Sequence, residues 1–225
     1  MVTAIILAAG ASRRMGRPKA LLPYRGETFL NRLIRIAGQV AGSTIVVVGP
    51  PYAGRIRKRA ITGPLFAANP EPERGQLSSL QIALAQLPPE AEGFFFIPVD
   101  CPAVREETVR RLATAFARRD PQTLFVIPRY GDRRGHPVFA ARSVASEFLA
   151  LPVEAQARDV VHRHVSRTFY VEVEDRGILA DIDDFAAYRE LVEAAGGELA
   201  RPSPSAEVQL ARPREAPLGR GFLRR

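Results

Sequence analysis

Apolar and polar positions along the first part of the chain follow two patterns. Short runs that are apolar at consecutive positions predict strands buried on both faces: residues 3–8, 44–48, 94–99 and 123–127. Longer segments with helical spacing or helical end signals predict helices: residues 28–40, 79–87 and 106–118. Strands and helices that alternate in this way predict an α/β fold with a mostly parallel sheet between layers of helices.

The pattern changes after Pro128. A polar turn at 129–135 comes first, and the later apolar segments predict short strands and a last helix: residues 137–139, 168–173, 178–182 and 184–194. We expect these strands to form a small antiparallel extension of the sheet. The predicted fold is a three-layer, Rossmann-like α/β domain over residues 1–196, with a first half at about 1–128 and a second half at about 129–196.

The composition of the chain indicates the cellular compartment in which we expect it to work. The single cysteine, Cys101, excludes an intrachain disulfide, which fits a reducing, cytoplasmic compartment. The first apolar run lacks a basic leader and is broken at Gly10, so we interpret it as a strand and not as a signal peptide. Because no apolar run approaches the roughly 20 residues that span a bilayer, no membrane is expected.

The net charge of +8 raises the question of an acidic partner. The arginines are scattered along the chain and form no basic stripe interleaved with aromatic residues, so we expect no nucleic acid. Residues 197–225 are rich in Pro, Arg and Gly and predict a disordered basic tail. This tail is either inert or serves to dock a partner or to attract phosphate.

The segment from Leu7 to Lys19 carries the first chemical signal. It follows a buried strand, where small residues let the backbone approach a ligand and present its amides to phosphate oxygens. Arg14 and Lys19 add positive charge that would stabilise a leaving pyrophosphate. The alternative is a glycine-containing loop with incidental basic residues. The candidate nucleotide-binding residues of this loop are Leu7, Ala8, Ala9, Gly10, Ser12, Arg14 and Lys19.

This thirteen-residue segment resembles the signature of the MobA-like nucleotidyltransferases, in particular the branch of molybdenum cofactor cytidylyltransferases. The resemblance covers residues from about 3 to 191. It implies a fold of the nucleotide-diphospho-sugar transferase type and a reaction that uses an NTP and Mg²⁺. In that family Leu-Ala-Ala-Gly is associated with CTP and Leu-Ala-Gly-Gly with GTP. Leu7-Ala8-Ala9-Gly10 therefore favours CTP.

Two acidic segments are candidates for the metal site. Asp100 directly follows the 94–99 strand, where ligands of α/β proteins bind, and is our first metal ligand. Asp181 and Asp183 point to one face of an extended segment, and we assign Asp183 to the metal and Asp181 to the acceptor without settling which of them meets the ion. The alternative roles are helix caps, Asp100 for the helix after it and Asp183 or Asp184 for the last helix. The family pattern Asp-Ile-Asp-Thr-Pro-Glu-Asp is retained here only in its first two aspartates.

Two further segments complete the candidate site. In 69–80 the resemblance suggests that a nucleobase is recognised, and the candidate residues are Asn69, Gly75, Ser78 and Ser79; simple N-capping of the following helix by Ser78 is the alternative. On the acceptor side, His136 stands in the family's Gly-His-Pro and Arg158 ends a segment that resembles Gly-Asp-x-Gly-Ala-Arg, although both glycines are replaced. His136 could instead be an ordinary turn residue. We expect Cys101 to pack as a buried thiol and His162 and His164 to lie on the surface.

The function that this sequence predicts is transfer of CMP from CTP to molybdopterin, with Mg²⁺ as cofactor and Arg14, Lys19 and Asp100 as catalytic residues. A molybdoenzyme or its maturation factor is a further possible partner. Three alternatives stay open or are weighed. One is transfer from GTP or CTP to another acceptor such as a sugar or polyol phosphate. Another is a carrier that delivers the cofactor without turnover. The third, a dinucleotide-dependent oxidoreductase, lacks its expected Gly-x-Gly-x-x-Gly.

Overall fold

The computed structural model describes residues 1–196, so the expected tail at 197–225 lies outside the described residues. Its main feature is a sheet of eight strands in the order β10-β7-β9-β6-β1-β4-β5, with β8 paired to β7. The strands are β1 (Val2–Ala8), β4 (Ser43–Val48), β5 (Leu65–Ala68), β6 (Gly93–Pro98), β7 (Phe125–Tyr130), β8 (Arg133–Arg134), β9 (Val138–Ala141) and β10 (Thr168–Glu172). A short hairpin of β2 (Pro23–Tyr24) and β3 (Glu27–Thr28) stands apart.

The sheet is mostly parallel, as the sequence predicts. Strands β6, β1, β4 and β5 run parallel to one another, and β10 runs parallel to β7. Strand β9 is antiparallel to both β6 and β7 and lies between them, so the antiparallel part is built into the sheet instead of extending its edge. The parallel order brings the carboxyl ends of β1 and β6 to one edge of the sheet.

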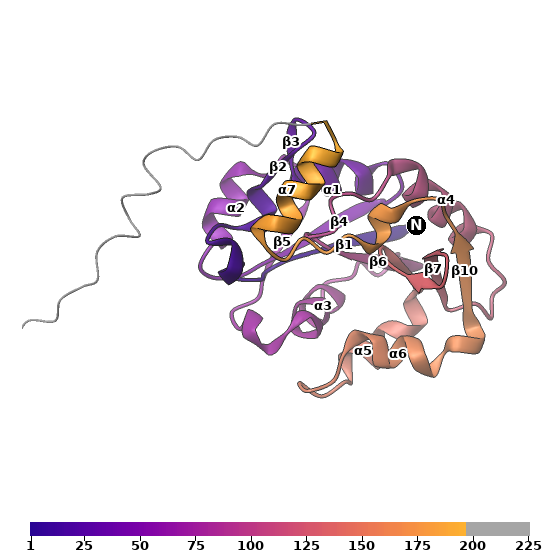
Figure 1. Cartoon of the computed structure of the whole chain (residues 1–225). Helices are drawn as coiled ribbons and strands as arrows, with labels where there is room; N and C mark the ends of the chain where they lie inside the picture. The colour runs from indigo at the N-terminus through magenta and orange to yellow at the C-terminus, as the bar shows by residue number, and fades with distance from the viewer. Residues whose placement is uncertain (197–225) are drawn as a thin grey trace, which may run out of the picture.

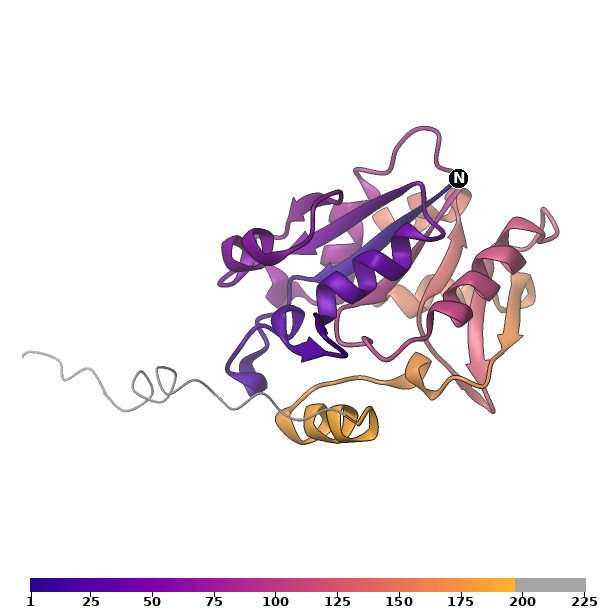
Figure 2. The same ribbon diagram turned by 90° about the horizontal axis from the view of Figure 1, so that it is seen from above.

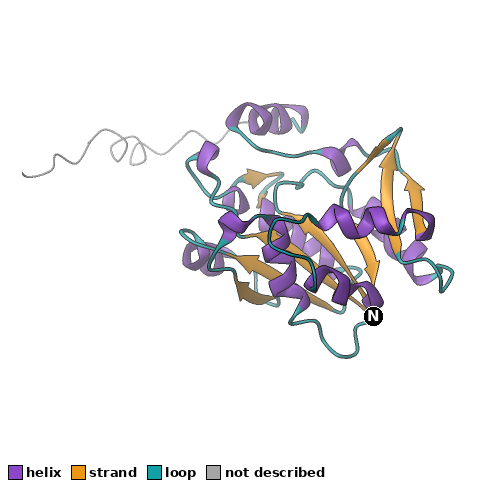
Figure 3. Ribbon diagram, turned by 90° about the horizontal axis from the view of Figure 1, so that it is seen from below, coloured by secondary structure: helices purple, strands orange, loops and turns teal. Residues whose placement is uncertain are grey.

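The described part of the chain has seven helices: α1 (Phe29–Gly38), α2 (Ala53–Arg59), α3 (Gln76–Leu84), α4 (Glu106–Ala117), α5 (Ala145–Leu149), α6 (Ala157–Arg163) and α7 (Phe185–Ala194). Helices α3, α5 and α6 pack on one face of the sheet, and α1, α2 and α4 on the other (Figure 1; Figures 2 and 3 look at the two faces). Helix α7 stands apart from the sheet and packs through Tyr188 against Phe29 and Pro23. The sheet is thus the middle of three layers, and the expected fold class is confirmed. None of the helices in residues 1–196 is both long and apolar enough to cross a membrane.

Successive side chains of β1 point to opposite faces of the sheet, which explains why the strand is apolar at consecutive positions. Ala4 and Ile6 belong to the core on the α1 and α4 side, whereas Ile5 and Leu7 belong to the core on the α3 side. All four are buried. A strand with helices on both faces must be apolar at every position, because each side chain enters one core or the other. The end of β1 is therefore held rigidly where the Leu7–Lys19 loop begins.

Some predicted elements need correction. The strand expected at 178–182 is wrong: Arg176–Leu179 is a 3₁₀ helix whose first turn is capped by the Asp175 side chain, and the chain after it is extended without a ladder partner. Helix α3 begins earlier than expected, at Gln76, with Gly75 and not Ser78 at its N-cap. His162 is exposed as expected, but His164 is half-buried because its ring nitrogen pairs with Glu147, 2.8 Å away. Helix α2, strand β5 and helix α5 had no clear sequence signal.

Candidate active site

The loop after β1 is shaped by Ser12. Its backbone adopts a left-handed conformation (φ 49°), and its Oγ accepts a hydrogen bond of 3.1 Å from the Lys19 backbone N–H. Its carbonyl oxygen accepts another from the N–H of Met15. Gly16 follows with φ 63°, a conformation that glycine adopts without strain. These contacts fold the loop back on itself, so that Lys19 returns to the edge of the sheet where the loop started.

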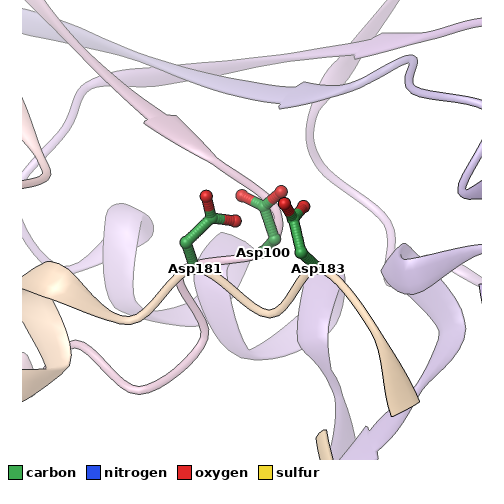
Figure 4. A group of neighbouring side chains, drawn as sticks. All are labelled: Asp100, Asp181 and Asp183. Atoms are coloured by element: carbon green, nitrogen blue, oxygen red, sulfur yellow. The ribbon is translucent and has the colours of Figure 1, made fainter. Parts of the chain in front are cut away.

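Three aspartates meet at this edge. Asp100 follows β6, and Asp181 and Asp183 lie on the extended chain between the Arg176–Leu179 3₁₀ helix and α7. One carboxylate oxygen of each lies within 4.8 Å of the others, and Figure 4 shows the three side chains side by side. Oxygen donors in this number and spacing suit a hard divalent cation such as Mg²⁺ or Mn²⁺.

Helix capping explains the position of Asp184, but not of Asp100 or Asp183. Arg105, not Asp100, is the N-cap of α4. Asp184 caps α7, because its Oδ1 accepts a 2.9 Å hydrogen bond from the Ala187 N–H. Asp100 and Asp183 cap no helix and are left for another role.

Two basic side chains from the first loop reach the aspartates. Lys19 Nζ lies 3.0 Å from Asp100 Oδ2 and 2.8 Å from Asp183 Oδ1, and Arg14 Nη2 lies 2.9 Å from Asp183 Oδ2. The Lys19 side chain is only 12% exposed, so its pairs are shielded from solvent, whereas Arg14 is mostly exposed. With three aspartates against two cations, the cluster keeps a surplus of negative charge.

The pKa values of these groups reflect this crowding. Burial by itself lowers the pKa of Lys19, but Asp100 and Asp183 outweigh burial, and the pKa is raised overall. The hydrogen bond from Lys19 lowers the pKa of Asp183. For Asp181, burial together with the charges of Asp100 and Asp183 outweighs the more distant charge of Lys19 and raises the pKa. A cation held between the three carboxylates would relieve that repulsion.

Two cavities open on either side of the aspartates. The first, of about 400 Å³, is lined mainly by the β1 loop and the start of α3. The second, of about 520 Å³, is lined by β8, α6 and the chain from Ile178 to Asp183. They share four lining residues, Gln76, Pro98, Asp100 and Asp183. Two ligands could therefore meet at Asp100 and Asp183, one from each side.

Comparison with known proteins identifies this arrangement. Residues 4–168 match the profile of the MobA-like NTP transferase domain. The chain belongs to the MobA-like NTP transferase family. The resemblance noted in the sequence is thus confirmed at the level of the family.

Relatives of this MobA-like chain include molybdenum cofactor transferases of two specificities. It is 27% identical over 195 residues to the molybdenum cofactor cytidylyltransferase of Escherichia coli K12, an alignment that covers 84% of this chain and 96% of the relative. It is 30% identical over 174 residues to the molybdenum cofactor guanylyltransferase of Rhizobium meliloti, which covers 73% and 76%. The nucleotidyltransferase class is thus shared, but the base differs between these relatives.

Solved structures agree on the fold. Rv0371c from Mycobacterium tuberculosis H37Rv matches with a TM-score of 0.73 and 31% identity, covering 86% of this chain and 98% of the other. A structure of Rv0371c in complex with manganese matches with a TM-score of 0.67 and 29% identity over the same shares. A nucleotidyl transferase from Methanothermobacter, at 20% identity and a TM-score of 0.73, shares the fold.

In this MobA-like site, most of the predicted nucleotide residues line the first cavity: Leu7, Ala9, Gly10, Ser12, Arg14, Lys19, Gly75 and Ser79. Three others do not line it. Ala8 is buried in the core with its side chain on the α1 face. Asn69 and Ser78 form a buried cluster behind the wall, in which Asn69 Nδ2 donates to Ser78 Oγ and Ser79 Oγ at 2.9 Å. The Ser78 hydroxyl in turn donates to the Gly75 carbonyl, 2.8 Å away. Asn69 and Ser78 therefore fasten the Gly75 turn to α3.

The predicted acceptor residues His136, Arg158 and Asp181 all line the second cavity. Within residues 1–196, the buried Nδ1 atom of His136 has no hydrogen-bond partner. Burial lowers the pKa of the imidazole and outweighs the Asp100 charge and the Phe96 backbone, which act to raise it. Cys101 also lines this cavity but is buried, and burial raises the pKa of its thiol well above the ordinary value, so it stays protonated.

Sequence reasoning missed several lining residues, and three of them are polar residues of interest for ligand binding. Gln76 borders both cavities, and Arg133 and Arg134 line the second. Among the described residues, neither arginine has a carboxylate within 4.0 Å, so both charges face the cavity or solvent unpaired. Their position directly before the Gly-His-Pro segment was the available signal.

Proposed function

We propose that this chain transfers CMP from CTP to the phosphate of molybdopterin, forming the cytosine dinucleotide of the cofactor and releasing pyrophosphate. The observation that carries the proposal is the meeting of two cavities at Asp100 and Asp183. CTP would occupy the first cavity and the acceptor the second. The acceptor oxygen would then face the α-phosphorus at the shared boundary, which is the arrangement that in-line displacement requires.

Asp100 and Asp183 would hold Mg²⁺, with Asp181 near enough to contribute a third oxygen. The bound ion would supply positive charge that stabilises the negative charge on the phosphates in the transition state. Mg²⁺ commonly binds one or two carboxylates together with substrate phosphates, and this aspartate set suits that pattern. The manganese found with Rv0371c supports a divalent ion in this fold.

The protein's own part of the chemistry is positioning and charge. Backbone amides of the loop at Ala9 and Gly10 would bind the triphosphate. Lys19 and Arg14 would move from Asp183 toward the phosphates and stabilise the negative charge that builds up on pyrophosphate as the bond between the α- and β-phosphates breaks. A phosphate acceptor is already anionic near pH 7, so no strong general base is needed. His136, neutral because burial lowers its pKa, would donate a hydrogen bond to the acceptor.

CTP is preferred over GTP on two grounds. Ala9, which lines the first cavity, stands where the GTP-associated signature has glycine. The alignment with the Escherichia coli cytidylyltransferase covers nearly the whole relative. We infer that the product passes to a molybdoenzyme or its maturation factor in the cytoplasm.

Pyrophosphate release by the purified protein tests this proposal. CTP, GTP, ATP and UTP are compared with Mg²⁺, each with and without molybdopterin, and EDTA is added as the metal control. Release that requires CTP, molybdopterin and Mg²⁺ together is the expected result. Release with GTP instead would support nucleotidyl transfer and show that the assignment of CTP is wrong. If no NTP gives pyrophosphate release although the pterin is intact, a panel of sugar and polyol phosphates is tested next. Release with one of them would identify another acceptor, and no release with any of them would favour a carrier without turnover.

A further inference from the structure

Asp175 is a buried carboxylate outside the site described above. It is 2% exposed and is the one acidic side chain in residues 1–196 that is fully buried. It lines neither the nucleotide cavity nor the acceptor cavity. Burying a carboxylate costs several kcal/mol unless hydrogen bonds replace its water, so its position needs an explanation.

The hydrogen bonds of Asp175 run to two separate parts of the chain. Oδ2 accepts from the Arg105 backbone N–H at 2.9 Å and from Thr108 Oγ1 at 2.6 Å, both at the start of α4. Oδ1 accepts from the Gly177 backbone N–H at 2.9 Å, at the start of the 3₁₀ helix. The carboxylate also sits at the N-terminus of the twelve-residue helix α4, where negative charge is favoured.

These two parts carry the metal-site aspartates. Asp100 opens the segment that leads from β6 to Arg105, and Asp181 and Asp183 end the segment that begins at Gly177. Asp175 therefore fastens together the far ends of both segments. At their near ends the Ile182 N–H donates to the Asp100 carbonyl oxygen at 3.1 Å.

Close packing between the segments leaves little slack. A Cβ atom at Gly177 would lie 2.3 Å from the carbonyl oxygen of Ala103, so the two backbones are in direct contact there. With the near ends joined and the far ends both hydrogen-bonded and in backbone contact, a shift of one segment must carry the other with it or break the Asp175 hydrogen bonds.

We propose that Asp175 is a positioning residue that sets the spacing of Asp100 against Asp181 and Asp183, and through it the affinity of the site for a divalent cation. The inference rests on the metal site of the proposed function. Removing a group that orients metal ligands without touching the metal typically lowers metal affinity 10- to 100-fold. Asp175 acts through the backbone, since its hydrogen-bond partners are two main-chain amides and a buried threonine. The mostly exposed Arg105 guanidinium adds a looser ion pair, with its Nε 3.8 Å from Asp175 Oδ1.

The test measures Mn²⁺ binding to the full chain by water-proton relaxation, with the protein alone and again with CTP but no acceptor. Asp175→Asn keeps the shape and removes the charge. We expect its dissociation constant for Mn²⁺ to rise by roughly 10- to 100-fold. Binding of CTP in EDTA, measured by calorimetry, should stay within about twofold, because none of the Asp175 contacts reaches the first cavity.

Asp120→Asn is the matched control. Asp120 follows the other end of α4, is exposed and accepts a hydrogen bond from the Gln122 N–H, so the same charge is removed far from the two segments. Its Mn²⁺ affinity should equal that of the wild type. Thermal unfolding of every variant is recorded, because a role in stability alone would lower the melting temperature and leave the Mn²⁺ affinity of the folded protein unchanged.

A second pair of variants decides the matter if Asp175→Asn does not fold. Thr108→Val removes the 2.6 Å hydrogen bond with little change in shape, and Thr108→Ser keeps a hydroxyl in place. The inference predicts weaker Mn²⁺ binding in the first and wild-type binding in the second. Unchanged Mn²⁺ affinity in Asp175→Asn, or in Thr108→Val, would overturn it and leave the proposed function intact. Absence of Mn²⁺ binding in the wild type would instead remove the metal site itself, and this inference with it.

Discussion

Lys19 Nζ lies 3.0 Å from Asp100 Oδ2, although 81 residues separate the two along the chain. The lysine comes from the loop after β1 and the aspartate from the end of β6, and these strands are neighbours in the sheet. The same ammonium also contacts Asp183. The cation proposed to stabilise the phosphates thus pairs with the same carboxylates that are proposed to hold the metal.

Replacement of Lys19 by methionine should act in opposite directions on binding and turnover. Without nucleotide, Lys19 competes with a metal ion for Asp100 and Asp183, so Lys19→Met should bind Mn²⁺ roughly tenfold more tightly. Pyrophosphate release should fall by about 10²- to 10³-fold, because one cation facing the transition state is lost. Metal titration and steady-state kinetics on the same preparation check both. A variant in which metal binding weakens would show that Lys19 does not compete for the site.

Asp183 and Asp184 offer a comparison of adjacent residues. Asp183→Ala should lower turnover by 100-fold or more with little effect on stability. Its ion pair with Arg14 is exposed, and such pairs contribute at most about 1 kcal/mol. The shielded Lys19 loses one partner but keeps its pair with Asp100. Asp184→Ala should do the reverse. It removes the α7 cap, at a cost of about 1 kcal/mol, and leaves turnover near the wild-type value. Urea unfolding beside pyrophosphate release separates the two. Equal losses of activity would contradict the assignment of Asp183 to the site.

Much of the fold was predictable because its physical cause is local. The β1 run from Ala4 to Ala8 and the β6 run are apolar at every position, as strands covered on both faces must be. The Thr28 cap of α1 was likewise visible in the sequence. The position of Asp100 followed from the rule that ligands bind beyond the carboxyl ends of parallel strands.

What sequence reasoning missed depends on partners far along the chain. Residues 178–182 are mostly apolar, as a strand would be, but the Ile182 N–H is taken by the Asp100 carbonyl and the segment pairs with no strand in residues 1–196. Asn69 and Ser78 match residue types that bind nucleotides, yet their hydrogen bonds are spent on each other and on Gly75. Only the folded chain reveals where a polar side chain finds its partner.

His136 should make stability depend on pH in a defined window. Burial lowers its pKa below the ordinary 6.5, so the unfolded chain takes up a proton at a higher pH than the folded chain does. The contribution of His136 to the free energy of unfolding should therefore be fully present well above pH 6.5. It should be lost as the pH drops from there toward the lower pKa of the folded state, and the loss is at most about 1.4 kcal/mol at pH 5.5. Urea midpoints at pH 7.5 and 5.5 measure the loss, and His136→Gln should show a smaller one. Identical losses in both proteins would argue against a buried neutral imidazole.

Gly135 should control the acceptor side without affecting the nucleotide side. A Cβ atom there would lie 2.1 Å from the Ile178 carbonyl oxygen, and the neighbouring His136 N–H donates to the same oxygen at 3.0 Å. Gly135→Ala must push the wall of the second cavity outward, which costs about 1–3 kcal/mol of stability. We expect the KM for the acceptor to rise roughly tenfold, while calorimetry finds the dissociation constant of CTP unchanged. Gly54→Ala is the control, since a methyl group on α2 meets open space and favours the helix. If Gly135→Ala weakened CTP and acceptor binding equally, the division of the site into two cavities with separate ligands would be wrong.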